Sequence, residues 1–154
     1  MLTGDPDALP PFSRSGDLPE GVHRATLAQV LERFGGETVQ RLAVANRLEH
    51  IYHTAHSSGF LVRFVVYGSF VTHKREPNDV DLFLIMEDSF DLAQVTGEAR
   101  LLFDHLAAQT HFGASVFWVR RLGCFGGEQA TIEHWQTKRD RGKRGIVEIV
   151  EDAL

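Results

Sequence analysis

Short apolar runs bounded by turn residues give this chain its clearest hydrophobic pattern. Residues 61–67 are rich in β-branched and aromatic side chains and stop at Gly68, and residues 80–86 form a second run of the same kind. Runs of this length and composition predict buried strands. Two further runs, at residues 114–119 and 145–150, predict two more strands.

Apolar residues at helical spacing predict four helices around these strands. The first begins at a capping box formed by Thr26 and Gln29, in which each side chain bonds the other residue's backbone N–H. The other three are expected over residues 39–57, 91–109 and 131–139. The order helix, helix, strand, strand, helix, strand, helix, strand predicts an α/β (α+β) fold, in which a small mixed β-sheet has helices packed on one face.

Candidate chemistry gathers where the first two strands meet. Asp79 and Asp81 open the second strand, and residues two apart on a strand point to the same face, so two carboxylates converge. Such closeness raises the pKa of one carboxylate unless a cation neutralises the pair. Oxygen ligands of this kind suit Mg²⁺ or Mn²⁺. Gly68 lets the backbone approach phosphates closely, and Ser69 offers a hydroxyl at the start of a short helical turn.

Gly68-Ser69, followed after a short loop by Asp79-Val80-Asp81, resembles the nucleotidyltransferase superfamily that includes DNA polymerase beta, the minimal nucleotidyltransferases and the aminoglycoside nucleotidyltransferases. In that superfamily a strand leads into Gly-Ser, a short helix and a loop, and then Asp-x-Asp on the next strand. The spacing agrees with the minimal members, although Pro77-Asn78 stands where they usually carry a turn ending in serine. A weaker resemblance, to a poorly characterised bacterial family of small nucleotidyltransferase-like proteins, extends over residues 9–12, 18–23 and 144–149.

The resemblance implies metal-dependent transfer of a nucleoside monophosphate from a nucleoside triphosphate (NTP) to a hydroxyl group of RNA, protein or a small molecule. It implies that Asp79 and Asp81 are the catalytic residues that hold Mg²⁺ or Mn²⁺, and that Gly68 and Ser69 hold the β- and γ-phosphates. Minimal members often occur in bacterial toxin–antitoxin or defence modules, so the resemblance also implies a role of that kind, with a partner protein.

The third carboxylate of active superfamily members, which completes the metal site and helps activate the attacking hydroxyl, is missing here. The strand expected at 114–119 contains no acid, and Ser115 stands in its place. Serine cannot act as a general base at neutral pH. His111 could supply a base, and Asp91 or Asp104 could reach the site from the preceding helix. The alternative function is a catalytically degenerate domain that binds a nucleotide or a partner protein.

Basic residues leave two questions open. Lys74 and Arg75, together with His73 in the loop before Asp79, could neutralise the charge of a triphosphate or simply form an exposed basic loop. A second basic cluster surrounds Asp140 and indicates either a solvated surface or an RNA-binding module. Its members are Lys138, Arg139, Arg141, Lys143 and Arg144. The formal net charge of -5 argues against a generic nucleic-acid binder.

The whole chain suits one ordinary globular domain. Its 154 residues are 43% apolar and 24% charged, and four of the five prolines lie in the first nineteen residues. We therefore expect an extended, proline-rich arm over residues 1–22 and a single domain over residues 23–154. Arg63 interrupts the longest apolar stretch, which argues against a membrane span. The single cysteine, Cys124, agrees with a reducing, cytoplasmic location.

Two lesser patterns also have alternatives. His50, His53 and His56 recur every third residue, so adjacent pairs on a helix could share a metal, but no acid or cysteine completes the set nearby in the sequence. A polar or partner-facing helix surface is the simpler interpretation. Four aromatic residues could stack a nucleobase, although aromatic residues close to strands mostly pack in the core. These are Phe117, Trp118, Phe125 and Trp135.

Overall fold

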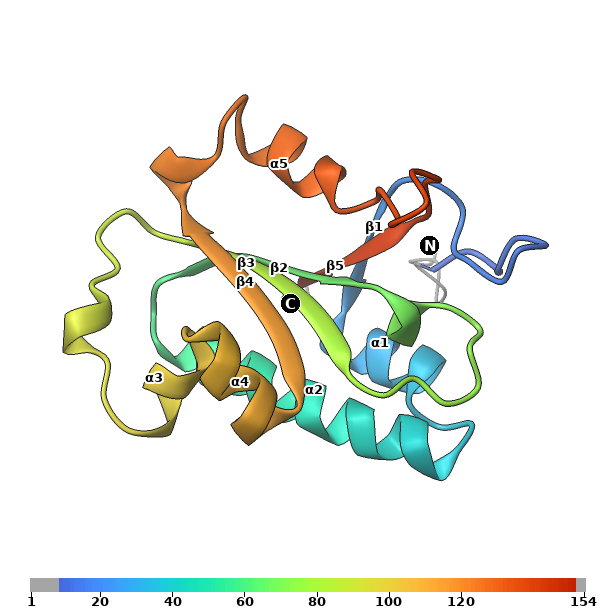
Figure 1. Cartoon of the computed structure of the whole chain (residues 1–154), viewed down its shortest axis with the longest axis horizontal. Coiled ribbons are helices and arrows are strands. Elements are labelled where there is room, and N and C mark those ends of the chain that lie inside the picture. Colours follow the sequence, from blue (N-terminus) through green and yellow to red (C-terminus); the bar gives the residue numbers. More distant parts are fainter. Residues whose placement is uncertain (1–8, 152–154) are drawn as a thin grey trace, which may run out of the picture.

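The computed structural model describes residues 9–151, and a five-stranded mixed β-sheet forms its centre (Figure 1). The strands are β1 (Val22–Thr26), β2 (Leu61–Tyr67), β3 (Val80–Met86), β4 (Ala114–Arg120) and β5 (Ile146–Val150). They lie in the order β1-β5-β2-β3-β4. β1 is parallel to β5 and β4 is parallel to β3, whereas β2 is antiparallel to both of its neighbours.

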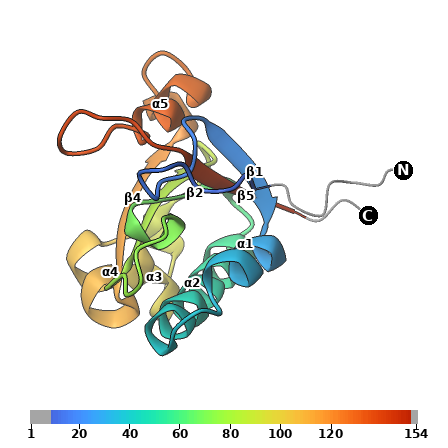
Figure 2. The same ribbon diagram turned by 90° about the vertical axis from the view of Figure 1, so that its right-hand side faces the viewer.

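Helices lie on both faces of this sheet. They are α1 (Leu27–Phe34), α2 (Val39–Ser57), α3 (Glu98–Leu102), α4 (His105–Phe112) and α5 (Glu128–His134). In Figures 1 and 2, α1 to α4 lie on one face and α5 lies on the opposite face. The predicted α/β fold with a small mixed sheet is confirmed. The helices pack on one face as expected except for α5, which covers part of the other face.

The helix and strand starts that depend on local signals agree with the sequence analysis. α1 begins at the predicted capping box, because the Gln29 backbone N–H donates to the Thr26 hydroxyl over 3.2 Å and the Thr26 N–H donates to the Gln29 side-chain oxygen over 2.8 Å. α2 covers the predicted residues 39–57, and β2 and β3 match the two predicted strands. These elements place the candidate acids and glycine on neighbouring strands.

The single helix predicted over residues 91–109 is wrong. The chain instead forms a 3₁₀ turn at Leu92–Gln94, then α3 and α4. The carboxylates of Asp91 and Asp104 each accept a backbone N–H over 3.0 Å, and each bond starts a new element. Gly97, with a φ of 68°, separates the first element from the second. Local capping therefore overrides the apolar spacing that indicates one long helix.

Two further differences concern β1 and α5. β1 is not predicted, and it forms because residues 22–26 pair in parallel with β5, which lies far along the chain. α5 starts and ends earlier than the helix predicted over residues 131–139. It follows Gly127, whose φ of 100° breaks the chain direction, and Glu128 in its first turn favours that start.

Alternate residues of the central strands divide the core into two layers. Val66 and Leu82 are fully buried between the sheet and α1 to α4. Phe83 points to the opposite face and packs in a second cluster with Ile132 of α5. Because Asp81 lies two residues before Phe83 on β3, it faces the α5 side of the sheet. The candidate site therefore opens on the face that α1 to α4 leave uncovered.

The described part of the expected arm, residues 9–22, packs against the domain, and its last residue, Val22, starts β1. Leu9 and Leu18 are buried, at 4% and 1% exposure. Arg33 donates hydrogen bonds to the carbonyl oxygens of Leu9 and Pro10 over 3.3 and 2.9 Å. Residues 1–8 of the expected arm lie outside the described residues. Within residues 9–151, none of the helices has the length and apolar character needed to cross a membrane.

Candidate functional site

Asp81 lies at the centre of the candidate site, between Tyr67 on β2 and Ser115 on β4. The strand register pairs Asp81 with both residues, and residues paired in this way share a face of the sheet. Burial, and then the charge of Asp79, raise the pKa of Asp81 to about 6. Burial and the same two carboxylates raise the pKa of Tyr67 as well. Asp79 and Asp81, here called the acid pair, therefore lie close enough to repel each other.

Gly68 allows the backbone to pass directly beside Asp81. Its φ of 81° lies in the left-handed region, and a Cβ atom at this position would lie 2.0 Å from a carboxylate oxygen of Asp81. A 3₁₀ turn (Ser69–Val71) follows, in which the Val71 N–H donates to the Gly68 carbonyl oxygen over 3.3 Å. Glycine is therefore required both by the backbone conformation and by the close approach of the carboxylate.

We expect Gly68→Ala to lower the free energy of unfolding by about 2–5 kcal/mol, because left-handed strain and the clash with Asp81 add together. Gly59 is a matched control, since its φ is also 81° but no atom lies within 4 Å of an added Cβ. Gly59→Ala should cost only about 1–2 kcal/mol. Urea unfolding measures both, and equal losses would contradict the close-approach argument. Asp81→Ala in the Gly68→Ala background should recover part of the loss.

Arg41 on α2 holds the loop between β2 and β3. The residue is 2% exposed, and its burial lowers its pKa. Its guanidinium donates to the carbonyl oxygens of Phe34, Phe70, Thr72 and Lys74 over 3.0, 2.8, 2.6 and 3.0 Å. Three of these carbonyls belong to the loop that joins the glycine turn to the acid pair. Arg41 is a positioning residue that the sequence analysis does not identify.

The loop backbone is fixed further by the start of α2, whereas its basic side chains stay in solvent. The Thr38 hydroxyl donates to the Arg75 carbonyl oxygen over 3.2 Å, and the Gln40 side-chain amide donates to the Pro77 carbonyl oxygen over 2.9 Å. The side chains of Lys74 and Arg75 are exposed, and neither forms an ion pair with another described residue. They are therefore available to an anionic ligand at this loop.

The basic cluster of the sequence forms a hairpin over residues 137–144, here called the basic hairpin. At its base Lys138 Nζ lies 3.1 Å, and a guanidinium nitrogen of Arg144 lies 3.6 Å, from the carboxylate of Asp17. The positive charge of Arg144 also opposes the rise in the pKa of Asp81. Figure 1 shows the hairpin, in red, beside the blue N-terminal segment. The structure thus brings this cluster next to the acid pair, which the sequence analysis does not foresee.

Among the described residues, the acid pair has no third carboxylate. Ser115 lies beside Asp81 in the strand register, at the position where the resemblance implies an acid. The structure does not bring His111 to this site, because its Nε2 lies 2.7 Å from Glu98, on the helical side. Asp91 and Asp104 cap short helical elements and are equally committed elsewhere. None of the three candidates for a general base that the sequence offers therefore lies at the acid pair.

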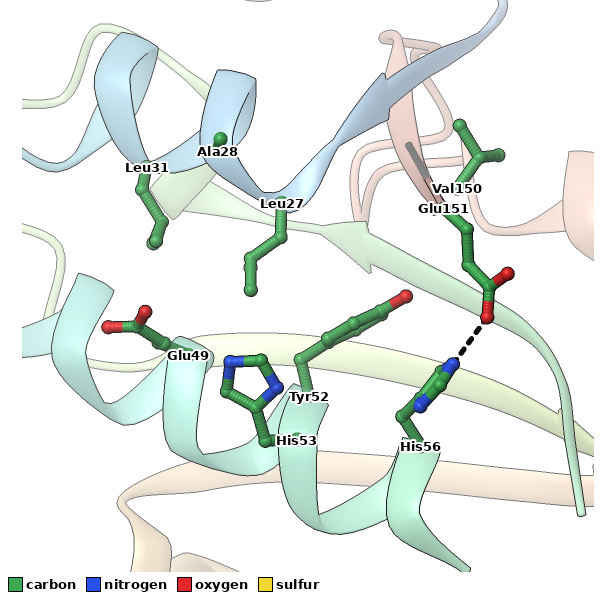
Figure 3. Close-up of a pocket in the computed structure, with 9 residues that line it drawn as sticks. All are labelled: Leu27, Ala28, Leu31, Glu49, Tyr52, His53, His56, Val150 and Glu151. Atoms are coloured by element: carbon green, nitrogen blue, oxygen red, sulfur yellow. Dashed lines mark hydrogen bonds and ion pairs between the residues drawn. The ribbon is translucent and has the colours of Figure 1, made fainter. Parts of the chain in front are cut away.

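Figure 3 shows a separate cavity of about 410 Å³ between α1, α2 and the end of β5. His53 and His56 line it, and His56 bonds Glu151, whereas His50 lies 3.0 Å from Glu98 outside this cavity. The three histidines thus face different surroundings. Within residues 9–151 no group of three histidine, cysteine, aspartate or glutamate side chains is placed to hold a metal ion.

Comparison with known proteins adds a family but no activity. No curated protein and no solved structure matches this sequence. Residues 10–150 match DUF6932, described as a family of unknown function. The match includes the glycine turn, the acid pair, Arg41 and the basic hairpin. Because it covers most of the chain, the chain belongs to the DUF6932 family of unknown function.

Proposed function

We propose that this protein is a cytoplasmic nucleotidyltransferase-like enzyme that binds an NTP with Mg²⁺ or Mn²⁺ and transfers the nucleoside monophosphate to a hydroxyl group of RNA, protein or a small molecule. The observation that carries the proposal is the close approach of Asp81 to Gly68 at the edge of two neighbouring strands, with Asp79 beside it. The resemblance to minimal nucleotidyltransferases also supports a role in a bacterial toxin–antitoxin or defence module, with a partner protein.

The residues of the acid pair fit a hard divalent cation. Both are carboxylates, their mutual repulsion favours a cation between them, and the missing Cβ of Gly68 lets the Asp81 carboxylate lie directly against the glycine turn. Bound Mg²⁺ or Mn²⁺ would neutralise charge that develops on the phosphates. Gly68 and Ser69 offer backbone N–H groups and a hydroxyl to the phosphates, and Lys74 adds positive charge at the loop.

The proposed transfer needs little covalent chemistry from the protein. The acceptor oxygen forms a bond to the α-phosphorus, the bond from that phosphorus to the bridging oxygen breaks, and pyrophosphate leaves with the electron pair. The acceptor proton passes to water, because Ser115 cannot take it at neutral pH. Loss of a general base typically removes about 10²–10⁴-fold in rate. Ser115 therefore favours one second candidate, a domain that binds the nucleotide or a partner protein without transfer.

Thermal unfolding with each NTP, with Mn²⁺ and again with chelator, tests the proposal. A ligand at about 100 times its dissociation constant should add roughly 2.7 kcal/mol to the free energy of unfolding. We expect this gain with at least one NTP, and we expect chelator to remove it. An assay for transfer of a labelled α-phosphate to an acceptor then distinguishes an active enzyme from a domain that only binds the nucleotide. If the gain in stability persists with chelator, or if no NTP gives a gain, the acid pair is not a metal–nucleotide site.

A further inference from the structure

The basic hairpin carries cations that the rest of the described chain does not neutralise. Arg139, Arg141 and Lys143 are exposed, and none of them forms an ion pair within residues 9–151. The other two basic residues of the hairpin are held by Asp17. Because the chain as a whole has a formal net charge of -5, this positive charge is local. A local group of free cations is the usual footprint of a phosphate-bearing partner.

The hairpin holds these cations in a defined place. The Lys138 N–H donates to the Gly142 carbonyl oxygen over 2.7 Å, and the Arg144 N–H donates to the Gln136 carbonyl oxygen over 3.0 Å. The Gln136 side chain in turn accepts the Gly21 N–H over 2.6 Å, which ties the hairpin to the start of β1. Fixed backbone lowers the entropy lost when a ligand binds.

A row of aromatic rings starts on the same face of the sheet and ends at the edge strand β4, where His105 of α4 joins it. Trp135 lies between Tyr67 and Phe117, at ring-centroid distances of 4.6 and 5.4 Å, and His105 lies 4.7 Å beyond Phe117. The planes of neighbouring rings are inclined by only 35°, 29° and 30°. We call these four residues the aromatic row. Tilted and stacked rings at these distances form a continuous apolar row, against whose exposed end another flat ring can pack.

Phe117 is the ring of this row that packing explains least. It keeps 42% of its surface exposed, so it contributes only part of its apolar area to the core. Its neighbour Trp118 points to the other face and donates to the Phe103 carbonyl oxygen over 2.9 Å. Phe117 follows Ser115 by two residues on β4, about 7 Å along the strand. The exposed ring thus lies within one nucleotide's reach of the acid pair.

Cations and stacking rings therefore occupy one face together with the acid pair. Asp17, which holds the base of the hairpin, follows Gly16, whose carbonyl oxygen accepts the His73 N–H over 2.9 Å in the loop before the acid pair. Tyr67 of the aromatic row pairs with Asp81 in the sheet. Proteins that bind single strands combine a positive surface for the phosphates with aromatic side chains for the bases. Tyr67 and Trp135 also pack against the second core cluster, but an acidic protein partner would use the cations and leave the exposed ring of Phe117 unexplained.

We propose that the acceptor is a single-stranded nucleic acid, whose phosphates bind the basic hairpin and one of whose bases joins the exposed end of the aromatic row, formed by Phe117 and His105. This inference rests on the proposed function, because the strand's terminal hydroxyl is the group that attacks the α-phosphorus. Trp135 and His105 lie on the two sides of the Phe117 ring, so the base packs where His105 is exposed and held by one bond of 3.2 Å to the Val116 carbonyl oxygen.

Fluorescence anisotropy with a labelled RNA strand of about 12 nucleotides, without NTP or metal, tests the surface directly. Three phosphate contacts predict a slope of about −2 when the logarithm of the affinity is plotted against that of the salt concentration. The triple variant Arg139→Gln/Arg141→Gln/Lys143→Gln should bring this slope close to zero and weaken binding at low salt by about tenfold or more. Arg100→Gln is a control on the opposite side, where the arginine is also exposed.

Ring substitutions give a different signature. Phe117→Leu should weaken RNA binding by about 5- to 100-fold while the salt slope stays at its parental value, because stacking releases no counterions. Phe117→Tyr should retain the affinity. Phe125→Leu is the matched control, since Phe125 is 92% exposed but lies outside the aromatic row. Far-ultraviolet circular dichroism and unchanged binding of Phe125→Leu exclude general misfolding as the cause.

The outcomes separate this inference from the proposed function. Salt-dependent RNA binding that both sets of variants weaken, together with a metal-dependent NTP gain, supports both. An NTP gain without RNA binding overturns the inference and leaves the proposed function standing. RNA binding without any NTP gain overturns the proposed function and with it the acceptor role. Polyglutamate that binds as tightly as RNA would show that the hairpin serves an acidic protein partner instead.

Discussion

At pH 7.5, we expect Asp81→Asn to raise the free energy of unfolding of the unliganded protein by about 1–2 kcal/mol. Burial and the charge of Asp79 raise the pKa of Asp81 from its ordinary value of 3.8 to about 6. Two pKa units correspond to about 3 kcal/mol, and solvent screening at this half-buried side chain reduces that figure. A neutral amide of the same shape avoids the penalty of the buried charge.

The pH dependence follows from the direction of the shift. Between about pH 4 and pH 6 the folded protein holds a proton on Asp81 that the unfolded chain has already lost. The parent protein should therefore lose stability as pH rises through this window and remain less stable above it. Asp81→Asn should lack this loss, so the two proteins should converge near pH 4 and differ most above pH 6.

Urea unfolding at several pH values between about 4 and 8 measures this difference. The control is Glu76→Gln, which removes one exposed acid from the loop next to the acid pair and should leave stability within about 0.5 kcal/mol. A loss of stability for Asp81→Asn at every pH would mean that the carboxylate stabilises the fold, which would contradict the argument from burial and repulsion.

With metal and nucleotide bound, the parent should become more stable than a variant that lacks both carboxylates of the acid pair. With Mn²⁺ and an NTP at about 100 times its dissociation constant, the parent should gain roughly 2.7 kcal/mol. Asp79→Asn/Asp81→Asn should gain nothing, because no carboxylate remains to bind the cation. A variant that is more stable alone and less stable with ligand is the expected signature of a binding site whose charges oppose folding.

The sequence predicts the parts of this fold that depend on neighbouring residues. The capping box at Thr26 starts α1 as expected, and the apolar runs at 61–67 and 80–86 become the two central strands. The prediction fails over residues 91–109, where Asp91 and Asp104 cap separate elements. β1 escapes prediction for the opposite reason, since its pairing with β5 spans almost the whole domain.

Some residues of the candidate site can be recognised in the sequence, and others are brought to the site only by the fold. Gly68 and the acid pair are recognisable in sequence because a strand period places the carboxylates together and a glycine ends the preceding strand. The nearness of the basic hairpin to Asp81 depends on the fold, and no local signal gives it. Arg41 did leave a signal, since it lies three and seven residues before Val44 and Leu48 on the buried face of α2. A charged residue on such a face requires partners.

We expect Arg41→Met to lower the free energy of unfolding by about 3–5 kcal/mol, because methionine fills part of the volume but donates no hydrogen bond. Hydrogen bonds to a charged group are each worth about 1.5–3 kcal/mol. The loss is smaller than their sum because water can donate to some of the four carbonyls once the guanidinium is removed. Arg41→Lys keeps the charge but cannot reach four separate carbonyls. It should therefore lower the free energy of unfolding, but by less than Arg41→Met does.

Arg47→Met is the control for this series, because Arg47 lies on the same helix but is exposed, and its side chain donates one hydrogen bond among the described residues, to the Asn78 carbonyl oxygen over 3.5 Å. It should change stability by less than about 0.5 kcal/mol. Hydrogen exchange gives a local readout: amides of residues 70–74 should lose protection in Arg41→Met before those of the central strands do. Equal effects at Arg41 and Arg47 would mean that the loop keeps its shape without the guanidinium. If Arg41→Lys instead restores stability but not the metal-dependent NTP gain, the planar guanidinium holds the glycine turn and the acid pair in the geometry that the ligand needs.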